Sequence, residues 1–410
     1  MGGYWAGIDW SEEKQDCVIV DDNGDVVRHL RIEETKEGVA QCIEALRDLN
    51  RTSHRFSRRQ VPVGIEDGNR LLVAELRRLR QPVVVIPPAV TARHRGRLAP
   101  AVSKADRTDA ALIANILRGA PARFREMPAT TDSASALAIL ARAQQDTAAR
   151  ARELAVRLRS HLTLYHPAAI KAWSGMDHGL CRAEARALLA VAPTPCAAAS
   201  LSKRRIADTI AAAGRIRLVD QEAGRLRDLF ALPQLRQCPA TEEAMGIRTR
   251  LQIAELDQTL QHAERLVDES NALFDQHPHA GIYRSFPACG PRVATRLFAE
   301  IGDDLTRLET SRGLRAYAGT APLTWASGGS RAVTHRTVCN RRLKNAVHQW
   351  AFGTLTRSPG CRALYDARRE AGDGYAAALR RVGGRLLSGL HHCLLTGQHY
   401  QEHAMFPHRE

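Results

Sequence analysis

The sequence predicts an N-terminal α/β domain built on a mixed five-stranded sheet, then a long helical region and a mostly helical C-terminal domain. Two observations support this division. Short apolar runs bounded by turn residues dominate the beginning of the chain, as expected for strands. From Ser135 onward, apolar residues recur at three- and four-residue spacing, which is typical of helices. We therefore expect three parts, at 1–125, 126–280 and 281–410.

The first part alternates strands and helices in a definite order. Strands are expected at 4–9, 17–20, 26–32, 61–65 and 82–86, with a hairpin turn at 21–24 and helices at 36–49, 71–79 and 104–117. The first three strands suit an antiparallel meander. The later alternation suits parallel strands joined by right-handed crossovers. This order is that of an RNase H-like fold.

The remainder of the chain is expected to be largely helical. The apolar residues of 137–165 and of 253–274 have the spacing of two long helices, which we expect to pair as an antiparallel coiled coil. Between them, the alanine-rich stretch 167–240 predicts shorter helices. Residues 282–350 are rich in glycine and turn signals, and 360–410 predicts a helical tail.

The chain is strongly basic. Its 59 lysines and arginines exceed its 44 acidic residues and give a net charge of +15. Such a field favours polyanionic partners, although many basic proteins bind no specific nucleic acid. The nine cysteines are odd in number and form no C-x-x-C pair. Without a signal peptide or a membrane-length apolar run, we expect a cytoplasmic protein with reduced thiols and no membrane partner.

Four acidic residues stand out by their positions. Asp9 ends the first predicted strand and Glu66 ends the fourth. In the predicted order these strands are neighbours at the sheet centre, so both carboxylates emerge at one edge. Asp106 and Asp109 share one face of the following helix. We expect the four carboxylates to converge.

Converging carboxylates call for bound cations. Two unit charges 4 Å apart repel by about 4 kcal/mol at an effective dielectric near 20. Mg²⁺ prefers oxygen ligands, and two such ions can promote phosphoryl transfer. Taken singly, Asp9 or Asp106 would be a turn or cap residue. The run 7–11 also resembles the phosphate-binding strand of actin-like sugar kinases, but the other glycine-rich loops of that fold are not found.

Two C-terminal segments carry further signals. Residues 285–302 resemble a helix-hairpin-helix element, with Ala288 where its first glycine usually stands; a plain helical turn is the alternative. Ser327 and Ser330 flank two glycines in a predicted flexible loop, near Arg331 and His335. Serine needs activation to act as a nucleophile, and such a loop taken alone is a structural turn.

These segments together resemble one family. The matching runs are 7–11, 64–66, 104–110, 318–322, 327–328 and 339–341. They resemble, in order and spacing, the DEDD-type insertion-sequence transposases of the insertion-sequence one-ten family, described as bridge-RNA-guided recombinases. The resemblance covers nearly the whole chain. It implies a RuvC-like DEDD catalytic domain, a helical coiled-coil region and a C-terminal transposase domain with the serine loop.

The resemblance also implies roles for individual residues and for partners. Asp9, Glu66, Asp106 and Asp109 would be the Mg²⁺-binding tetrad, and Ser327 would be the nucleophile that joins DNA, with Ser330 as the substitute. The implied partners are double-stranded donor and target DNA, a noncoding bridge RNA that selects them by base pairing, and further copies of the chain in a dimer or tetramer.

Alternatives remain for several of these features. A RuvC-like structure-specific endonuclease would use the same acids with water as the nucleophile, and a noncatalytic RNA- or DNA-binding protein would use the positive charge alone. The basic stretches 51–59 and 93–97 are candidate nucleic-acid contacts or solvated surface. The cluster of histidines and cysteine within 391–403 lacks paired ligand spacing and is expected to be structural.

Overall fold

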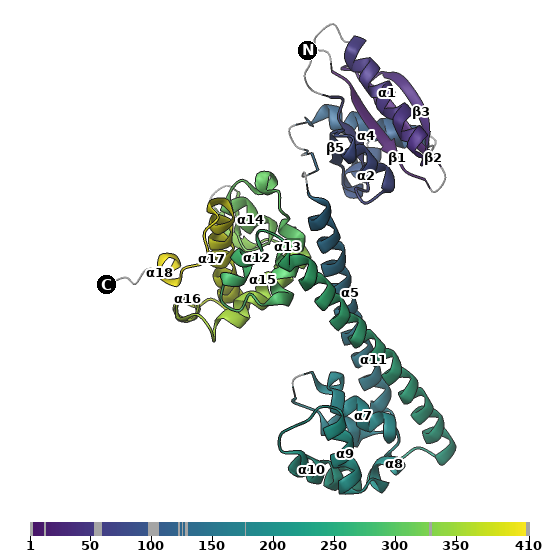
Figure 1. Cartoon of the computed structure of the whole chain (residues 1–410), viewed down its shortest axis with the longest axis vertical. Helices are drawn as coiled ribbons and strands as arrows, with labels where there is room; N and C mark the ends of the chain where they lie inside the picture. The colour runs from purple at the N-terminus through teal and green to yellow at the C-terminus, as the bar shows by residue number, and fades with distance from the viewer. Residues whose placement is uncertain are drawn as a thin grey trace. The chain divides into compact units, whose positions relative to one another are not determined.

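The computed structural model describes residues 3–11, 14–52, 60–96, 106–121, 124, 126–127, 130–176, 178–327 and 330–406. The chain divides into two compact units, Met1–Ala129 and Thr130–Glu410 (Figure 1). The buried apolar side chains form clusters within each unit, and no cluster of the described residues draws on both. No described helix is long and apolar enough to cross a membrane.

The first unit contains a mixed five-stranded sheet in the order β3-β2-β1-β4-β5. Strands β1 (Trp5–Asp9), β2 (Lys14–Val20) and β3 (Val26–Glu33) pair antiparallel, whereas β4 (Val63–Ile65) and β5 (Val83–Val85) continue from β1 in parallel. The predicted meander, the predicted parallel strands and the adjacency of the first and fourth strands are therefore confirmed.

Helices cover both faces of this sheet. On one face, apolar side chains of the strands pack with those of α1 (Lys36–Thr52) and α2 (Leu71–Arg78). On the other face, α4 (Asp106–Gly119) packs against β1 and β2. A short helix, α3 (Pro88–Arg95), which the sequence did not predict, precedes α4. The α4 face carries the candidate acids.

The second unit is organised around two long helices, α5 (Asp132–Thr163) and α11 (Pro239–Asp275) (Figure 1). Arg150 of α5 pairs with Glu255 of α11, and about three turns further along α5 the ring of His161 contacts the carbonyl oxygen of Met245. Because the partners descend in number as α5 ascends, the two helices run antiparallel. The two predicted long helices are confirmed.

A small group of helices lies between α5 and α11 in the sequence. It comprises α6 (Pro167–Ala172), the 3₁₀ turn η2 (Gly179–Cys181), α7 (Ala183–Val191), α8 (Pro195–Ser200), α9 (Lys203–Ala212) and α10 (Val219–Ala231). Their core includes Tyr165, Trp173 and Phe230 and extends onto α5 and α11. The expectation of shorter helices here is confirmed.

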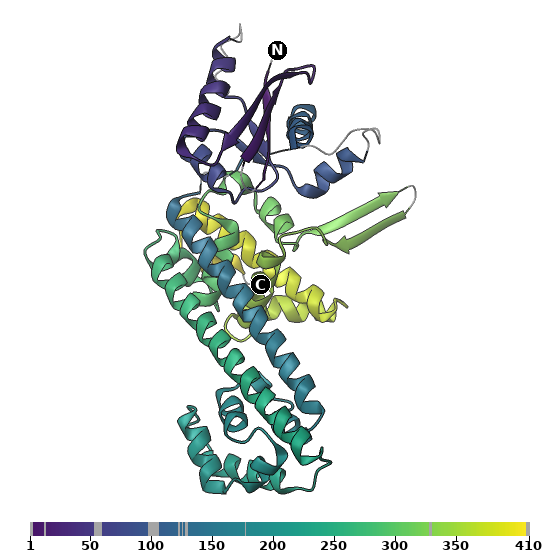
Figure 2. The ribbon, with the colours of Figure 1, turned by 90° about the vertical axis from the view of Figure 1, so that its right-hand side faces the viewer.

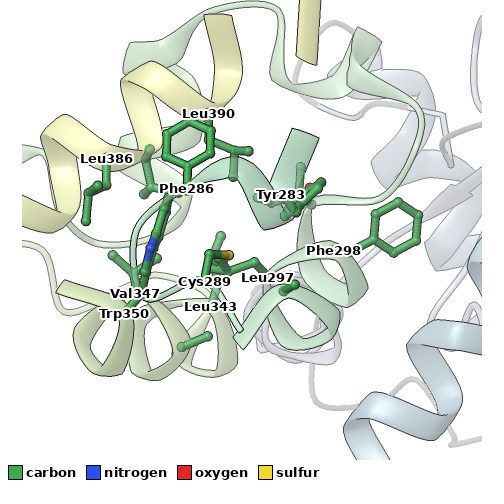
Figure 3. Packing of buried hydrophobic residues seen from close by; sticks show 14 of the residues in the cluster. Tyr283, Phe286, Cys289, Leu297, Phe298, Leu343, Val347, Trp350, Leu386 and Leu390 are labelled. Carbon is green, nitrogen blue, oxygen red and sulfur yellow. The ribbon is translucent and has the colours of Figure 1, made fainter. Parts of the chain in front are cut away.

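The C-terminal helices form the other core of the second unit. They are α12 (Ala280–Ser285), α13 (Pro291–Ile301), η3 (Leu305–Leu308), α14 (Ser311–Tyr317), α15 (Arg341–Thr354), α16 (Pro359–Glu370), α17 (Tyr375–Thr396) and α18 (Glu402–Met405). Figure 3 shows Trp350 of α15 beside Phe286, in the same cluster as Leu386 and Leu390 of α17. The indole nitrogen of Trp350 donates to the carbonyl oxygen of Pro287 at 3.0 Å.

The predicted serine loop is instead part of a β-hairpin. Strands β6 (Pro322–Ser327) and β7 (Ser330–His335) pair antiparallel, and Ser327 faces Ser330 in the register. Figure 2 shows the two strands as a ribbon that projects from the helices of its unit. Ser327 and Ser330 therefore lie at the ends of two paired strands, which the sequence did not predict, while Gly328 and Gly329 between them lie outside the described residues.

Candidate functional site

Asp9 and Glu66 lie at the same edge and on the same face of the sheet. Gly7 pairs with Gly64 in the parallel register of β1 and β4, so the residues two positions later are also level. A Cβ atom on Gly7 would meet the backbone of α4, and one on Gly64 would meet Ile113 of α4. Since side chains two apart share a face, Asp9 and Glu66 both project toward the α4 side.

The direction of α4 brings its first turn toward this edge. Asn115 and Arg118, near the end of α4, hydrogen-bond to the carbonyl oxygens of Gly24 and Asp22 in the β2–β3 turn. That turn lies beside the amino end of β1, because Trp5 pairs with Val20. The start of α4, with Asp106 and Asp109, therefore lies toward the carboxyl end of β1. The side chain of Asp106 is outside the described residues.

Helix α3 links Glu66 to Asp109. Thr91 Oγ1 donates a hydrogen bond to Glu66 Oε1. One turn later, Arg95 Nη2 lies 2.8 Å from Asp109 Oδ1. Thr91 and Arg95 are four residues apart and so are neighbours on one face of α3. Their carboxylate partners, Glu66 and Asp109, are therefore both held beside that face. Thr91 is buried and the side chain of Asp109 is only 14% exposed.

A further carboxylate, which the sequence analysis did not single out, adjoins this edge. Asp16 pairs with Asp9 across β1 and β2, and it is buried. Its Oδ1 lies 2.5 Å from Nε2 of His29 on the neighbouring strand, and its Oδ2 lies 4.0 Å from Arg31. Asp16 is thus already charge-paired within the sheet. The antiparallel register of the first two strands was the signal that could have revealed it.

The structure thus places three of the four predicted acids around one sheet edge. Asp9 and Glu66 are level on adjacent strands, and Asp109 is joined to Glu66 through two side chains of α3. Among the described residues no three His, Cys, Asp or Glu side chains are already grouped as a metal site. Carboxylate oxygens are nevertheless the donor type that Mg²⁺ requires.

The neck of the β6–β7 hairpin is held by a buried polar network. Asn340, which caps α15, donates from its backbone amide to the carbonyl oxygen of Tyr317 at 2.8 Å. Its Nδ2 contacts both Tyr317 Oη and Glu300 Oε2 at 2.7 Å. Glu300 is 3% exposed and also accepts from Arg142 of α5 at 2.9 Å. That bond raises the pKa of Arg142.

Close backbone packing completes the neck. Gly319 adopts a positive φ of 71°, and a Cβ atom there would lie 2.8 Å from Cys339 Sγ. The chain entering the hairpin is thereby fastened to the chain leaving it. The side chains of Ser327 and Ser330 themselves lie outside the described residues, as do Gly328 and Gly329.

The segment 285–302 forms a turn between two helices. The short α12 is followed by Ala288 with a left-handed φ of 55°, then by Gly290 as the N-cap of α13. The left-handed residue is the one that stands where a helix-hairpin-helix element usually has glycine. This conformation costs a non-glycine residue roughly 1–2 kcal/mol.

The other predicted contacts are only partly visible. Arg93, His94 and Arg95 occupy the last turn of α3, and Arg95 is engaged with Asp109. Residues 53–59 and 97 lie outside the described residues. At the C-terminus, His391 Nε2 contacts the carbonyl oxygen of Leu308 at 2.7 Å and is buried in the core.

Comparison with known proteins identifies the family. A family model described as "Transposase", of the DEDD type, matches residues 6–167. A second, described as "Transposase IS116/IS110/IS902 family", matches residues 280–366. The first match contains the sheet and its acids, and the second contains the hairpin and its neck.

Individual relatives agree with these matches. The chain is 40% identical to the mini-circle protein assigned as the transposase of IS117 from Streptomyces coelicolor, over 98% of this chain and 96% of the relative. It is 29% identical to the 43.6 kDa protein of insertion element IS110 from the same organism, over 77% and 76%. It is 27% identical to the 42 kDa protein of IS900 from Mycobacterium paratuberculosis, over 94% of each chain. With an acid-bearing sheet, a C-terminal hairpin and near full-length similarity, the chain belongs to the IS110 family of transposases.

Proposed function

We propose that this transposase cuts and rejoins DNA with an RNase H-like, Mg²⁺-binding first unit and a serine nucleophile in its second unit. The observation that carries the proposal is the level placement of Asp9 and Glu66 on adjacent parallel strands. The strand order β3-β2-β1-β4-β5 supports the RNase H-like assignment. Membership of a transposase family makes phosphodiester chemistry the relevant reaction.

Asp9, Glu66, Asp106 and Asp109 would hold the metal. All four offer hard carboxylate oxygens, and mutual repulsion at one sheet edge favours a divalent cation among them. When bound, Mg²⁺ would offset negative charge that develops on the scissile phosphate. Thr91 and Arg95 orient Glu66 and Asp109, so they act as positioning residues rather than ligands.

Ser327 would attack the DNA. Its Oγ forms a bond to phosphorus, the bond to one strand oxygen breaks, and the serine proton leaves so that a phosphoserine ester and a free DNA hydroxyl result. Attack by another DNA hydroxyl on the ester reverses these changes and frees Ser327. The ester conserves the bond energy needed for rejoining. Ser330, its cross-strand partner, is the alternative nucleophile.

The proposed partners follow from charge and family. The net charge of +15 suits double-stranded donor and target DNA and a noncoding bridge RNA that selects them. We propose that the protein acts in the cytoplasm as a dimer or tetramer, in which one copy's acidic unit works with another's hairpin. The antiparallel α5–α11 pair would be the coiled-coil region of the three-domain division at 1–125, 126–280 and 281–410.

The test is to trap the covalent intermediate. The full chain is incubated with Mg²⁺, the RNA encoded beside its gene and donor and target duplexes, and the protein–DNA adduct is mapped by peptide mass spectrometry. We expect the adduct at Ser327, its loss in Ser327→Ala and Asp9→Ala, and its persistence in Ser330→Ala.

Three other outcomes of this experiment would each indicate a different mechanism. Strand cleavage that survives in Ser327→Ala without any adduct would indicate hydrolysis by water, as in a RuvC-like endonuclease. Recombination by Asp9→Ala at the wild-type rate would remove the acidic site from the mechanism. An adduct at Ser330 would exchange the roles of the two serines.

A further inference from the structure

Arg296 of α13 carries a buried charge that pairs with no carboxylate of the described residues. The residue is 8% exposed. Its Nε and Nη2 donate to Gln144 Oε1 at 2.9 and 2.7 Å, and its Nη1 donates to Gln349 Oε1 at 2.8 Å. These acceptors are neutral amides. Burial of a charge is costly unless it is paired, so the hydrogen bonds fix the guanidinium without neutralising it.

Other arginines in the same unit have acidic partners. Arg142, two positions before Gln144 on α5, pairs with Glu300, and Arg215 pairs with Glu184. The geometry at Arg296 therefore differs from the usual arrangement in this protein. Two glutamines on two helices hold a cation in a fixed orientation where a glutamate on either helix would have cancelled its charge.

Two more arginines surround this position. Arg292 lies one turn before Arg296 on α13, and Arg152 lies on α5. Both are exposed, and neither has a carboxylate partner among the described residues. Burial together with these two neighbouring charges lowers the pKa of Arg296 to about 10. The contacts of Arg296 with Gln144 and of Glu300 with Arg142 set α13 antiparallel to α5, so the start of α13, with Arg292, and Arg152 of α5 lie toward the same end of this contact.

The first turn of α13 adds to the positive electrostatic potential of these arginines. Arg292 lies in its first turn, which begins after Gly290 and Pro291 and has no side-chain cap. The amino end of a helix carries roughly half a positive charge and attracts anions. Because Arg142 pairs with Glu300 and Gln144 pairs with Arg296, α13 descends as α5 ascends, and its first turn points toward Arg152.

We propose that Arg152, Arg292 and the start of α13 form a phosphodiester-binding site, with Arg296 as a fixed charge behind it. Arginine suits a phosphate group because its planar fork donates two parallel hydrogen bonds. The ligand is the backbone of a nucleic acid, so binding is independent of base sequence. The site includes none of the proposed metal ligands or nucleophiles, so it does not rest on the proposed catalytic roles.

The test compares two matched double variants of the full-length protein. Arg152→Gln with Arg292→Gln removes two charges from the site. Arg150→Gln with Arg157→Gln removes two charges from exposed arginines of α5 that already pair with Glu255 and Glu153. Binding to a random-sequence DNA duplex and to an unrelated RNA hairpin is measured by fluorescence anisotropy in EDTA from 50 to 300 mM salt, so that no cutting occurs.

We expect the Arg152/Arg292 variant to bind at least one of the two probes more weakly and the control variant to bind nearly as the wild type does. The slope of log K against log salt should fall in magnitude by about 1–2, as expected when two phosphate contacts are lost. A loss with DNA alone assigns the site to DNA, and a loss with RNA alone assigns it to RNA. Unchanged binding of both probes, or an equal loss in the control, would overturn the site.

Discussion

His166 is the residue that most directly ties stability to pH. It is fully buried between Tyr165 and Phe230, with ring centroids 6.0 and 6.1 Å away. Neither ring nitrogen has a hydrogen-bond partner among the described residues. Burial lowers the pKa of His166 to about 4. The folded protein therefore holds a neutral imidazole.

This arrangement predicts acid sensitivity of the second unit. In the unfolded chain the imidazole takes up a proton below about pH 6.5, whereas the folded chain resists protonation until about pH 4. The contribution of His166 to the free energy of unfolding is therefore fully present above pH 6.5. It falls as the pH drops toward 4, by up to about 3 kcal/mol. Urea unfolding of His166→Phe at pH 7.5 and 5 should show a smaller difference than the wild type.

The exposed His262 provides the control. His262→Phe makes the same substitution at an exposed position of α11 and is expected to keep the wild-type difference between the two pH values. If His166→Phe lost stability between pH 7.5 and 5 as steeply as the wild type, another group would be responsible for the acid sensitivity.

For single residues, the sequence indicated Asp9 and Glu66 by their positions at strand ends, and Asp106 and Asp109 by their shared helix face. It could not indicate the residues that orient them. Thr91 and Arg95 lie on a helix with one buried residue, which leaves little periodic signal. Asp16 lies beside the acidic edge of the sheet only because the strand register pairs it with Asp9. Contacts between separate strands and helices belong to the tertiary structure, so the roles of Thr91, Arg95 and Asp16 could be recognised only in the folded protein.

Among the elements, the contact of α4 with β1 depends on Gly7. A Cβ atom there would lie 2.1 Å from the carbonyl oxygen of Ala110 and 2.5 Å from the amide nitrogen of Ala114. Backbone atoms cannot rotate away, so Gly7→Ala should displace α4 from the sheet. We expect a loss of about 3 kcal/mol or more in the free energy of unfolding, with loss of recombination.

Gly64 is a matched control on the neighbouring strand. A Cβ atom there would approach the side chains of Ile113 and Ile86 at 2.9 and 3.1 Å. Side chains can adjust, so Gly64→Ala should cost less than Gly7→Ala by chemical denaturation. Equal losses in the two variants would show that helix displacement is not the cause.

Element prediction from the sequence succeeded where patterns were long or strictly alternating. The five strands of the sheet and the two long helices were found. The β6–β7 hairpin was not predicted, because a Ser-Gly-Gly-Ser run suits a loop as well as a turn and the flanking residues 322–327 and 330–335 lack strict alternation of apolar and polar side chains. The second strand begins at Lys14, earlier than predicted, because its polar start pairs with β1 and β3.

For the whole molecule, the separate cores of the two units predict independent folding. The second unit contains every member of its two large apolar clusters, from Ala134 to Met405. Residues 130–410 expressed alone should therefore unfold cooperatively with an m-value that matches their size. Chemical denaturation followed by circular dichroism checks this, and a gradual, noncooperative loss of helicity would contradict it.

For the whole molecule, the sequence predicted the order of the helices and strands along the chain, but not all of the contacts between them. It suggested that α5 and α11 associate. Their register is fixed by contacts such as Arg150 Nη2 with Glu255 Oε1 at 2.9 Å, between residues far apart in the chain. The order of motifs therefore constrained the architecture, while the contacts between motifs were decided by packing.

The antiparallel course of α5 and α11 has a consequence for how this chain can change over time. Helices α5 and α11 run in opposite directions, and the sequence between them contains the short helices α6–α10. Because the core of α6–α10 extends onto α5 and α11, we expect insertions or deletions to be tolerated in the loops between these short helices and not in that shared core. Such changes would leave the return of the chain at α12, and with it the hairpin-bearing bundle, in place.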